Sequence, residues 1–114
     1  MKKPGSKGEH YLQKKFNTEK RAALFYKKTN SLKRGDEIIV PALSWPTTYA
    51  PLYQYGLRLK FVDIDLNTLN YDLEALKSAV SDKTRAIMLV NILGNPNDFK
   101  SIQEIISNRN IFII

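Results

Sequence analysis

Side chains suited to chemistry follow the short apolar runs of this 114-residue sequence, at the points where those runs end. The run IIVPAL is followed by Ser44, Trp45, Thr47 and Thr48. Ligands of open α/β sheets lie outside the carboxyl ends of the strands, so a binding site is expected at these positions. A flat indole between short polar side chains could stack on an aromatic ligand. The competing interpretation is that Trp45 only caps the core.

A second run ends in two carboxylates, Asp63 and Asp65 of the stretch FVDID. Carboxylates at positions i and i+2 share one face of a strand and could hold Mg²⁺. The five glycines form neither G-x-G-x-x-G nor G-x-x-x-x-G-K-[ST], so no phosphate-binding loop accompanies the two acids. We therefore favour a polar turn after a buried strand and predict no metal site.

Asn91 ends the third run, in the stretch NILGNPNDF, where it could reach a ligand or belong to a turn. The residues from Gly94 to Asn97 have typical turn chemistry, and Asn97 is a candidate N-cap for a following helix. His10 is the only histidine, and no serine is placed with it as a nucleophile pair. No catalytic residue is predicted.

The strands that would position these side chains are predicted by apolar runs rich in branched residues. Four such runs are EIIVPAL, LRLKFVDI, TRAIMLVNI and IFII. The first is apolar on both faces, as in a strand that is covered on both sides of a parallel sheet.

The segments between these runs predict helices. YDLEALKSAV and DFKSIQEIISNR have the periodicity of amphipathic helices, and Asp72 can cap the first of them. The apolar stripe of the second helix consists of Phe99, Ile102, Ile105 and Ile106. In PTTYAPLYQYG, Pro46 suits the first turn of a helix, whereas Pro51 would kink its middle.

Strands and helices alternate along the chain, an order that favours parallel strands joined by right-handed crossovers. The predicted fold class is therefore α/β, a partial parallel sheet with covering helices. The sequence stops inside its last apolar run, with no turn residue after it, so we expect a domain that is truncated at the C-terminus. Two segments are predicted, a basic helical segment over residues 1–34 and a partial α/β domain over residues 35–114.

The net charge of +7 comes from the first segment, because residues 1–34 carry +9 and residues 35–114 carry −2. A basic segment can attract nucleic acid, but its four aromatic residues form no stacking pattern, so we favour a solvated helix face. No apolar run approaches the ~20 residues of a membrane span, and there are no cysteines for a disulfide framework. With no secretory signal evident either, we expect a cytoplasmic protein without a membrane partner.

Taken together, residues 24–114 resemble the DegT/DnrJ/EryC1/StrS family of sugar aminotransferases. The motifs that carry the resemblance are GDE-I-VPA, an aromatic residue shortly after it, FVDID, K-T-AI and a turn before an aspartate. They are matched at Gly35, Asp36, Glu37, Val40, Pro41, Ala42, Trp45, Asp63, Asp65, Lys83, Thr84, Ala86, Ile87 and Asp98. The stretch KGEHYLQKKF is similar to the helix that begins the family's large domain. The forms ALSWPTTY and NILGNPNDF are more similar to the nucleotide-sugar 3-dehydrases of lipopolysaccharide dideoxysugar pathways than to the plain aminotransferases.

The resemblance implies a fold-type I enzyme that depends on pyridoxal 5′-phosphate or pyridoxamine 5′-phosphate. Intact relatives are expected to be homodimers that act on nucleotide-linked 4-keto-6-deoxysugars. Residues 35–114 would then be part of the large domain. The resemblance assigns Trp45 as the ring that packs against the cofactor, and it puts Asn91 near the same site.

Three groups that the family uses are not found in this sequence. There is no Ser-Gly pair, and NTEKRAA stands where a phosphate-binding turn at a helix N-terminus belongs. The sequence also ends before the acid that pairs with the pyridine nitrogen, and before the lysine of the aldimine or the histidine that replaces it. Because cofactor chemistry needs these groups, we expect a fragment that is inactive alone. The alternative is a non-catalytic interaction protein that docks on a full-length family member.

Overall fold

Strands and helices alternate in the computed structural model, which describes residues 31–114. The elements are β1 (Glu37–Pro41), α3 (Pro46–Gln54), β2 (Arg58–Val62), α4 (Leu73–Ala79), β3 (Thr84–Ile87), the 3₁₀ turn η1 (Ile92–Gly94), α5 (Phe99–Ile106) and β4 (Phe112–Ile113). His10 and residues 1–30 of the predicted basic helical segment lie outside the described residues, and residues 31–34 of that segment are not helical. None of the helices within residues 31–114 is long and apolar enough to cross a membrane.

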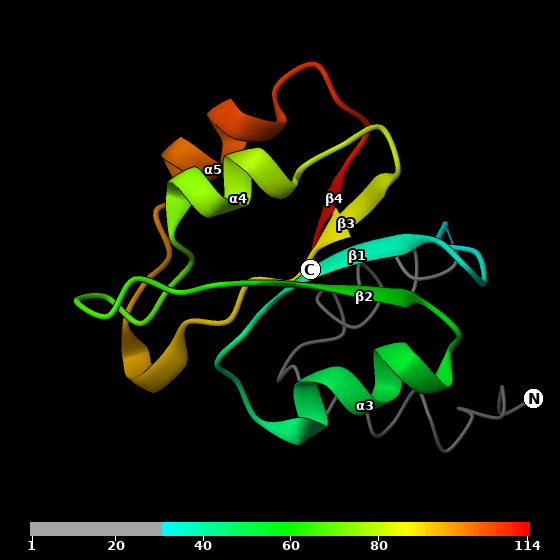
Figure 1. Cartoon of the computed structure of the whole chain (residues 1–114), viewed down its shortest axis with the longest axis horizontal. Helices are drawn as coiled ribbons and strands as arrows, with labels where there is room; N and C mark the ends of the chain where they lie inside the picture. The colour runs from blue at the N-terminus through cyan, green and yellow to red at the C-terminus, as the bar shows by residue number, and fades with distance from the viewer. Residues whose placement is uncertain (1–30) are drawn as a thin grey trace, which may run out of the picture. The chain divides into compact units, whose positions relative to one another are not determined.

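The four strands form one parallel sheet in the order β2-β1-β3-β4, which confirms the predicted α/β architecture. At the centre of the sheet, Ile39 of β1 is opposite Lys60 of β2 and Ile87 of β3. Figure 1 shows α3 on one side of the sheet and both α4 and α5 on the other. Both faces of β1 are therefore covered, as the sequence of that strand predicts.

The main core lies between the sheet and the pair of helices α4 and α5. It contains the fully buried side chains Ile39, Leu76 and Ile87, together with Val62, Tyr71 and Ile102. Because successive side chains of a strand point to opposite faces, Ile38 and Val40 point away from this core, and they are also fully buried.

The helix ends confirm one predicted cap and correct another. Asp72 caps α4, where its side chain accepts hydrogen bonds from the backbone N–H groups of residues 74 and 75. The N-cap of α5 is Asp98, which accepts from the N–H and the hydroxyl of Ser101, so the predicted Asn97 cap is wrong. Either side chain could cap a helix, but Asn97 is buried and hydrogen-bonded elsewhere.

Two details of the predicted helices also differ from expectation. Helix α3 runs without interruption across Pro51, with Pro46 in its first turn. In α5, Ile102 is buried and Ile105 and Ile106 pack on the core, whereas Phe99 at the start of the predicted stripe is 50% exposed.

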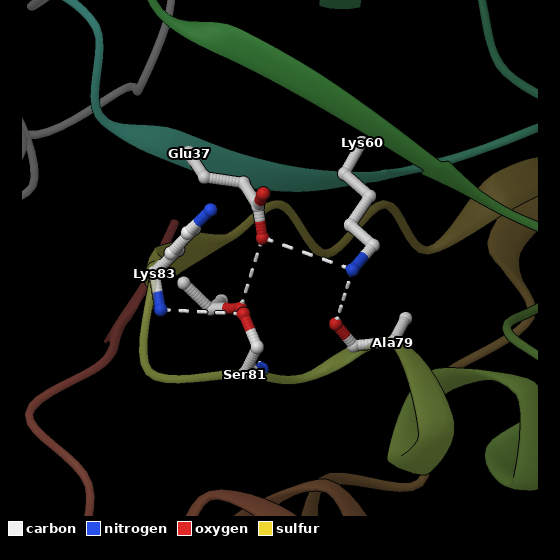
Figure 2. Close-up of polar contacts among 6 residues, drawn as sticks. Glu37, Lys60, Ala79, Ser81 and Lys83 are labelled. Carbon is white, nitrogen blue, oxygen red and sulfur yellow. Dashed lines mark hydrogen bonds and ion pairs between the residues drawn. The ribbon is translucent and has the colours of Figure 1, made fainter.

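A polar cluster fixes the amino end of the sheet, the end opposite to the predicted site (Figure 2). The Thr84 hydroxyl donates to Oε1 of Glu37 at 3.2 Å, and these are the first residues of β3 and β1. Lys60 Nζ donates to the carbonyl of Ala79 at 2.7 Å and lies 4.0 Å from Oε1 of Glu37. Lys60 thus joins the C-terminal end of α4 to the sheet, where a cation is favoured by the helix dipole.

Candidate functional site

The strand order creates a topological switch point at the carboxyl edge of the sheet, between β1 and β3. The chain leaves β1 through α3 toward β2, and it leaves the neighbouring β3 through α5 toward β4. Since α3 and α5 cover opposite faces, the two connections diverge from adjacent strands (Figure 1). Ligands of open α/β sheets bind at such a switch point, and the segments that follow β1 and β3 are those that contain Trp45 and Asn91.

Trp45 occupies the N-cap position of α3, and its side chain is 71% exposed. Its carbonyl accepts a hydrogen bond from the N–H of Thr48, while its indole makes no cap contact. This exposure favours the ring-stacking interpretation of Trp45 over the interpretation that it caps the core. The indole is instead presented to solvent by a helix start, as a ring-stacking role requires.

The loop that carries Trp45 is held by three polar or aromatic contacts. The hydroxyl of Tyr49 donates to the carbonyl of Pro41, where β1 ends, and its ring packs edge-to-face on Phe61 of β2 with centroids 5.2 Å apart. The hydroxyl of Ser44 donates to the hydroxyl of Thr48 at 2.9 Å. Burial raises the pKa of Tyr49, so the hydroxyl keeps its proton and remains a donor at neutral pH.

Asn91 is exposed after β3, and its side-chain oxygen is held by Asn97. Oδ1 of Asn91 accepts from the backbone N–H of Asn97 at 3.0 Å and from Nδ2 of Asn97 at 2.9 Å. Next to it, Leu93 is 82% exposed and has the left-handed backbone angle φ of 51°. A non-glycine residue in this conformation is uncommon and is often found at functional sites.

Tyr71 joins β1 to the segment that follows β3. It is 4% exposed, and its hydroxyl donates to the carbonyl of Met88 at 2.7 Å and lies 3.3 Å from the carbonyl of Ile39. Burial raises the pKa of Tyr71 far above its ordinary value, so this hydroxyl is a permanent donor. The contact fixes the backbone of β1 relative to the segment that leads to Asn91.

The acids Asp63 and Asp65 make local hydrogen bonds, as expected for a polar turn. Asp63 Oδ1 accepts from the N–H of Ile64, and Asp65 Oδ1 accepts from the N–H of Asn67. A cavity of about 350 Å³ lies beside Asp65, between the starts of α4 and α5, and neither Trp45 nor Asn91 lines it. Within residues 31–114, no group of three or more histidine, cysteine or acidic side chains is arranged to hold a metal.

The sequence pointed to Trp45 and Asn91, and the structure adds Tyr49, Tyr71 and Asn97 as the residues that support them. No pattern in the sequence identifies these three, because each acts through a contact with a carbonyl or side chain on another element. The switch point thus has an exposed aromatic side chain after β1 and an exposed amide after β3.

A parallel sheet with a switch point between β1 and β3, and an exposed aromatic ring after β1, defines the chain as part of an open α/β fold. Residues 21–114 match the model of the DegT/DnrJ/EryC1/StrS aminotransferase family, and the chain belongs to this family. The predicted resemblance and the predicted fold-type I architecture are thereby confirmed.

The chain is similar to GDP-4-keto-6-deoxy-D-mannose 3-dehydratase of Escherichia coli O55:H7. The two are 64% identical over 93 residues, which cover 82% of this chain and 24% of that enzyme. The dTDP-4-dehydro-2,6-dideoxy-D-glucose 3-dehydratase of Saccharopolyspora spinosa is 43% identical over 83 residues, which cover 73% of this chain and 18% of that enzyme. The chain therefore spans about a quarter, or less, of the length of the relatives it matches.

Solved structures of relatives have the same fold. The E. coli GDP-4-keto-6-deoxy-D-mannose 3-dehydratase with bound hydrated pyridoxal phosphate superposes with a TM-score of 0.73 at 65% identity, over 81% of this chain and 24% of that one. The pyridoxal-phosphate form of the sugar aminotransferase Spr1654 from Streptococcus pneumoniae gives a TM-score of 0.62 at 28% identity, over 65% of this chain and 19% of that one. Relatives on both the dehydratase and the aminotransferase side thus share this sheet.

Proposed function

We propose that this chain forms one wall of a cofactor site in a pyridoxal-phosphate-dependent nucleotide-sugar 3-dehydratase or aminotransferase. The observation that carries the proposal is the indole of Trp45, 71% exposed at the switch point of the sheet. An indole in this position fits the face of a pyridine ring, and Asn91 supplies a polar group after the neighbouring strand β3. Such a cofactor, when bound, provides the electron sink for chemistry next to the substrate carbonyl.

The substrate class that we propose is a nucleotide-linked 4-keto-6-deoxysugar, since the dehydratase relatives are named for sugars of this kind. The proposed setting is a cytoplasmic homodimer, in which residues 35–114 contribute to the large domain and residues 1–34 form a separate basic segment. The 114 residues contain no Ser-Gly turn for a phosphate. We therefore expect the isolated chain to recognise the ring weakly and to have no turnover.

A binding experiment tests the recognition of the ring. Trp45 is the only tryptophan, so its indole signal in a ¹⁵N–¹H correlation spectrum reports on this site alone. Pyridoxamine 5′-phosphate is the appropriate probe, because it lacks the aldehyde that would react with the many lysines. Inorganic phosphate at the same concentration controls for attraction to the basic segment. A shift of the indole signal with the first and not with the second supports the proposal, and no shift with either refutes it.

A turnover assay tests the expected inactivity. The chain is incubated with a nucleotide-4-keto-6-deoxysugar and pyridoxal or pyridoxamine phosphate, with the Trp45→Ala variant as control. Cofactor-dependent product above that control would overturn the claim that the chain is inactive alone.

A second candidate function is a non-catalytic interaction with a full-length family member. The position of β4 at one end of the described sheet favours it, because an edge strand can pair with another chain. Co-purification of the untagged chain with a tagged full-length relative would support this function. A chain that stays monomeric in the presence of that relative would contradict it.

A further inference from the structure

The hydrogen bonds of Asn91 determine which of its side-chain atoms can reach a ligand. Oδ1 accepts from the backbone N–H of Asn97 at 3.0 Å. A backbone N–H can only donate, so the Asn91 atom that faces it must be the oxygen, and the orientation of the amide is fixed.

The orientation of Asn97 is fixed by the same reasoning. Its Nδ2 donates to the carbonyl of Val90 at 2.9 Å, and a carbonyl can only accept. The same Nδ2 donates to Oδ1 of Asn91 at 2.9 Å. Asn97 is 9% exposed, so its side-chain amide is largely shielded from water, and a buried donor that loses its partner is costly.

The loop around Asn97 is also held from its other side. Nδ2 of Asn70, itself 9% exposed, donates to the carbonyl of Pro96 at 2.9 Å. The backbone at Asn97 is therefore held in place, because the preceding residue, Pro96, is hydrogen-bonded to the buried side chain of Asn70.

We propose that the side chain of Asn97 is a positioning group that holds Asn91 as a pure hydrogen-bond donor at the switch point. This inference rests on the proposed function, and it specifies the polarity of the site. Oδ1 of Asn91 already accepts two hydrogen bonds, whereas its Nδ2 has no partner among the described residues. The group that Asn91 recognises must then be an acceptor, such as a phenolic, carbonyl or phosphate oxygen of the cofactor or the sugar.

The first test needs no ligand. The order of the Asn91 side-chain amide is measured by its heteronuclear ¹⁵N relaxation in the chain and in two variants. Asn97→Ala removes the side-chain bonds to Asn91 and Val90 and keeps only the bond from the backbone N–H to Oδ1 of Asn91. Asn95→Ala is the matched control, because Asn95 lies in the same loop and its amide donates to the carbonyl of Thr68 instead. We expect the Asn91 amide to lose order in Asn97→Ala and to keep it in Asn95→Ala. An amide equally ordered in Asn97→Ala and in the parent chain would overturn the proposal.

The second test uses pyridoxamine 5′-phosphate as the ligand. Asn97→Ala is expected to weaken binding about three- to tenfold, the value of one net hydrogen bond, while Asn95→Ala leaves it unchanged. Asn91→Asp keeps the acceptor that faces Asn97 but replaces the donor by a second oxygen. It should therefore remain folded and bind more weakly than either alanine variant.

The outcomes separate this inference from the proposed function. If the ligand shifts the Trp45 indole but not the Asn91 amide, the donor role of Asn91 is refuted and the cofactor site stands. If the ligand shifts neither signal, the proposed function fails, and the relaxation measurement still decides whether Asn97 holds Asn91. Equal affinity of the Asn97→Ala variant and the parent chain would refute the positioning role.

Discussion

Replacing Tyr71 by phenylalanine tests the contact that joins β1 to the segment after β3. The substitution keeps the buried ring and removes only the hydroxyl that donates to the carbonyl of Met88 at 2.7 Å. That carbonyl accepts no other hydrogen bond from the described residues, whereas the carbonyl of Ile39 still accepts from the N–H of Met88 at 2.9 Å. The variant therefore loses one hydrogen bond and leaves one partly buried carbonyl without a partner.

The expected cost is about 1–2 kcal/mol in the free energy of unfolding. This cost combines the net value of one hydrogen bond with the desolvation penalty of the unpaired Met88 carbonyl. The penalty is partial, since Met88 is only partly buried. Urea unfolding followed by circular dichroism measures the difference between the variant and the parent chain. Tyr53→Phe is the matched control, because that ring is 74% exposed and its hydroxyl loss should cost almost nothing.

The stability difference between the parent chain and Tyr71→Phe should also depend on pH. Burial raises the pKa of Tyr71 in the folded state. The contribution of this group to the free energy of unfolding is therefore complete below the unfolded pKa of about 10, and it declines as the pH rises above that value. At pH 11 the unfolded chain would release the Tyr71 proton and the folded chain would not, a difference of about 1.4 kcal/mol. The parent chain should therefore lose about this much more stability than Tyr71→Phe between pH 9 and pH 11. Equal stability of the two chains at pH 7, or parallel alkaline profiles, would refute the reasoning.

Three further predictions concern the frame of the site. Gly56→Ala should destabilise the chain by about 1–2 kcal/mol in urea unfolding, because Gly56 has φ of 92° and an added Cβ would lie 2.5 Å from Cγ of Arg34. Leu76→Ala should cost about 2–5 kcal/mol in the same assay, since this side chain is fully buried in the main core. Hydrogen bonds from Ser101 lower the pKa of Asp98, so Asp98→Ala should speed amide exchange in α5 at pH 7. This difference in exchange rate between Asp98→Ala and the parent chain should shrink as the pH falls below about 4, because the Asp98 carboxylate of the parent chain is then protonated. Unchanged exchange at pH 7 would contradict the role of Asp98 as a cap.

Local sequence signals determined the elements of this fold. The branched, uninterrupted run of β1 predicts a strand buried on both faces, and Asp72 before an apolar stripe predicts the start of α4. The alternation of such elements predicts parallel pairing. Trp45 and Asn91 could be selected for the same reason, since each follows a predicted strand at the edge where ligands bind.

Only the tertiary structure decided how these elements combine into a site. The position of β1 between β2 and β3 depends on the packing of whole faces, and no local pattern encodes it. The choice of Asp98 over Asn97 as a cap, and the use of Asn97 to hold Asn91, depend on which side chain becomes buried when α5 docks. Tyr71 illustrates the same limit, because its hydroxyl bonds the carbonyl of a residue 17 positions away. Periodicity specifies what a segment forms by itself, whereas these long-range contacts exist only once the segments are packed together.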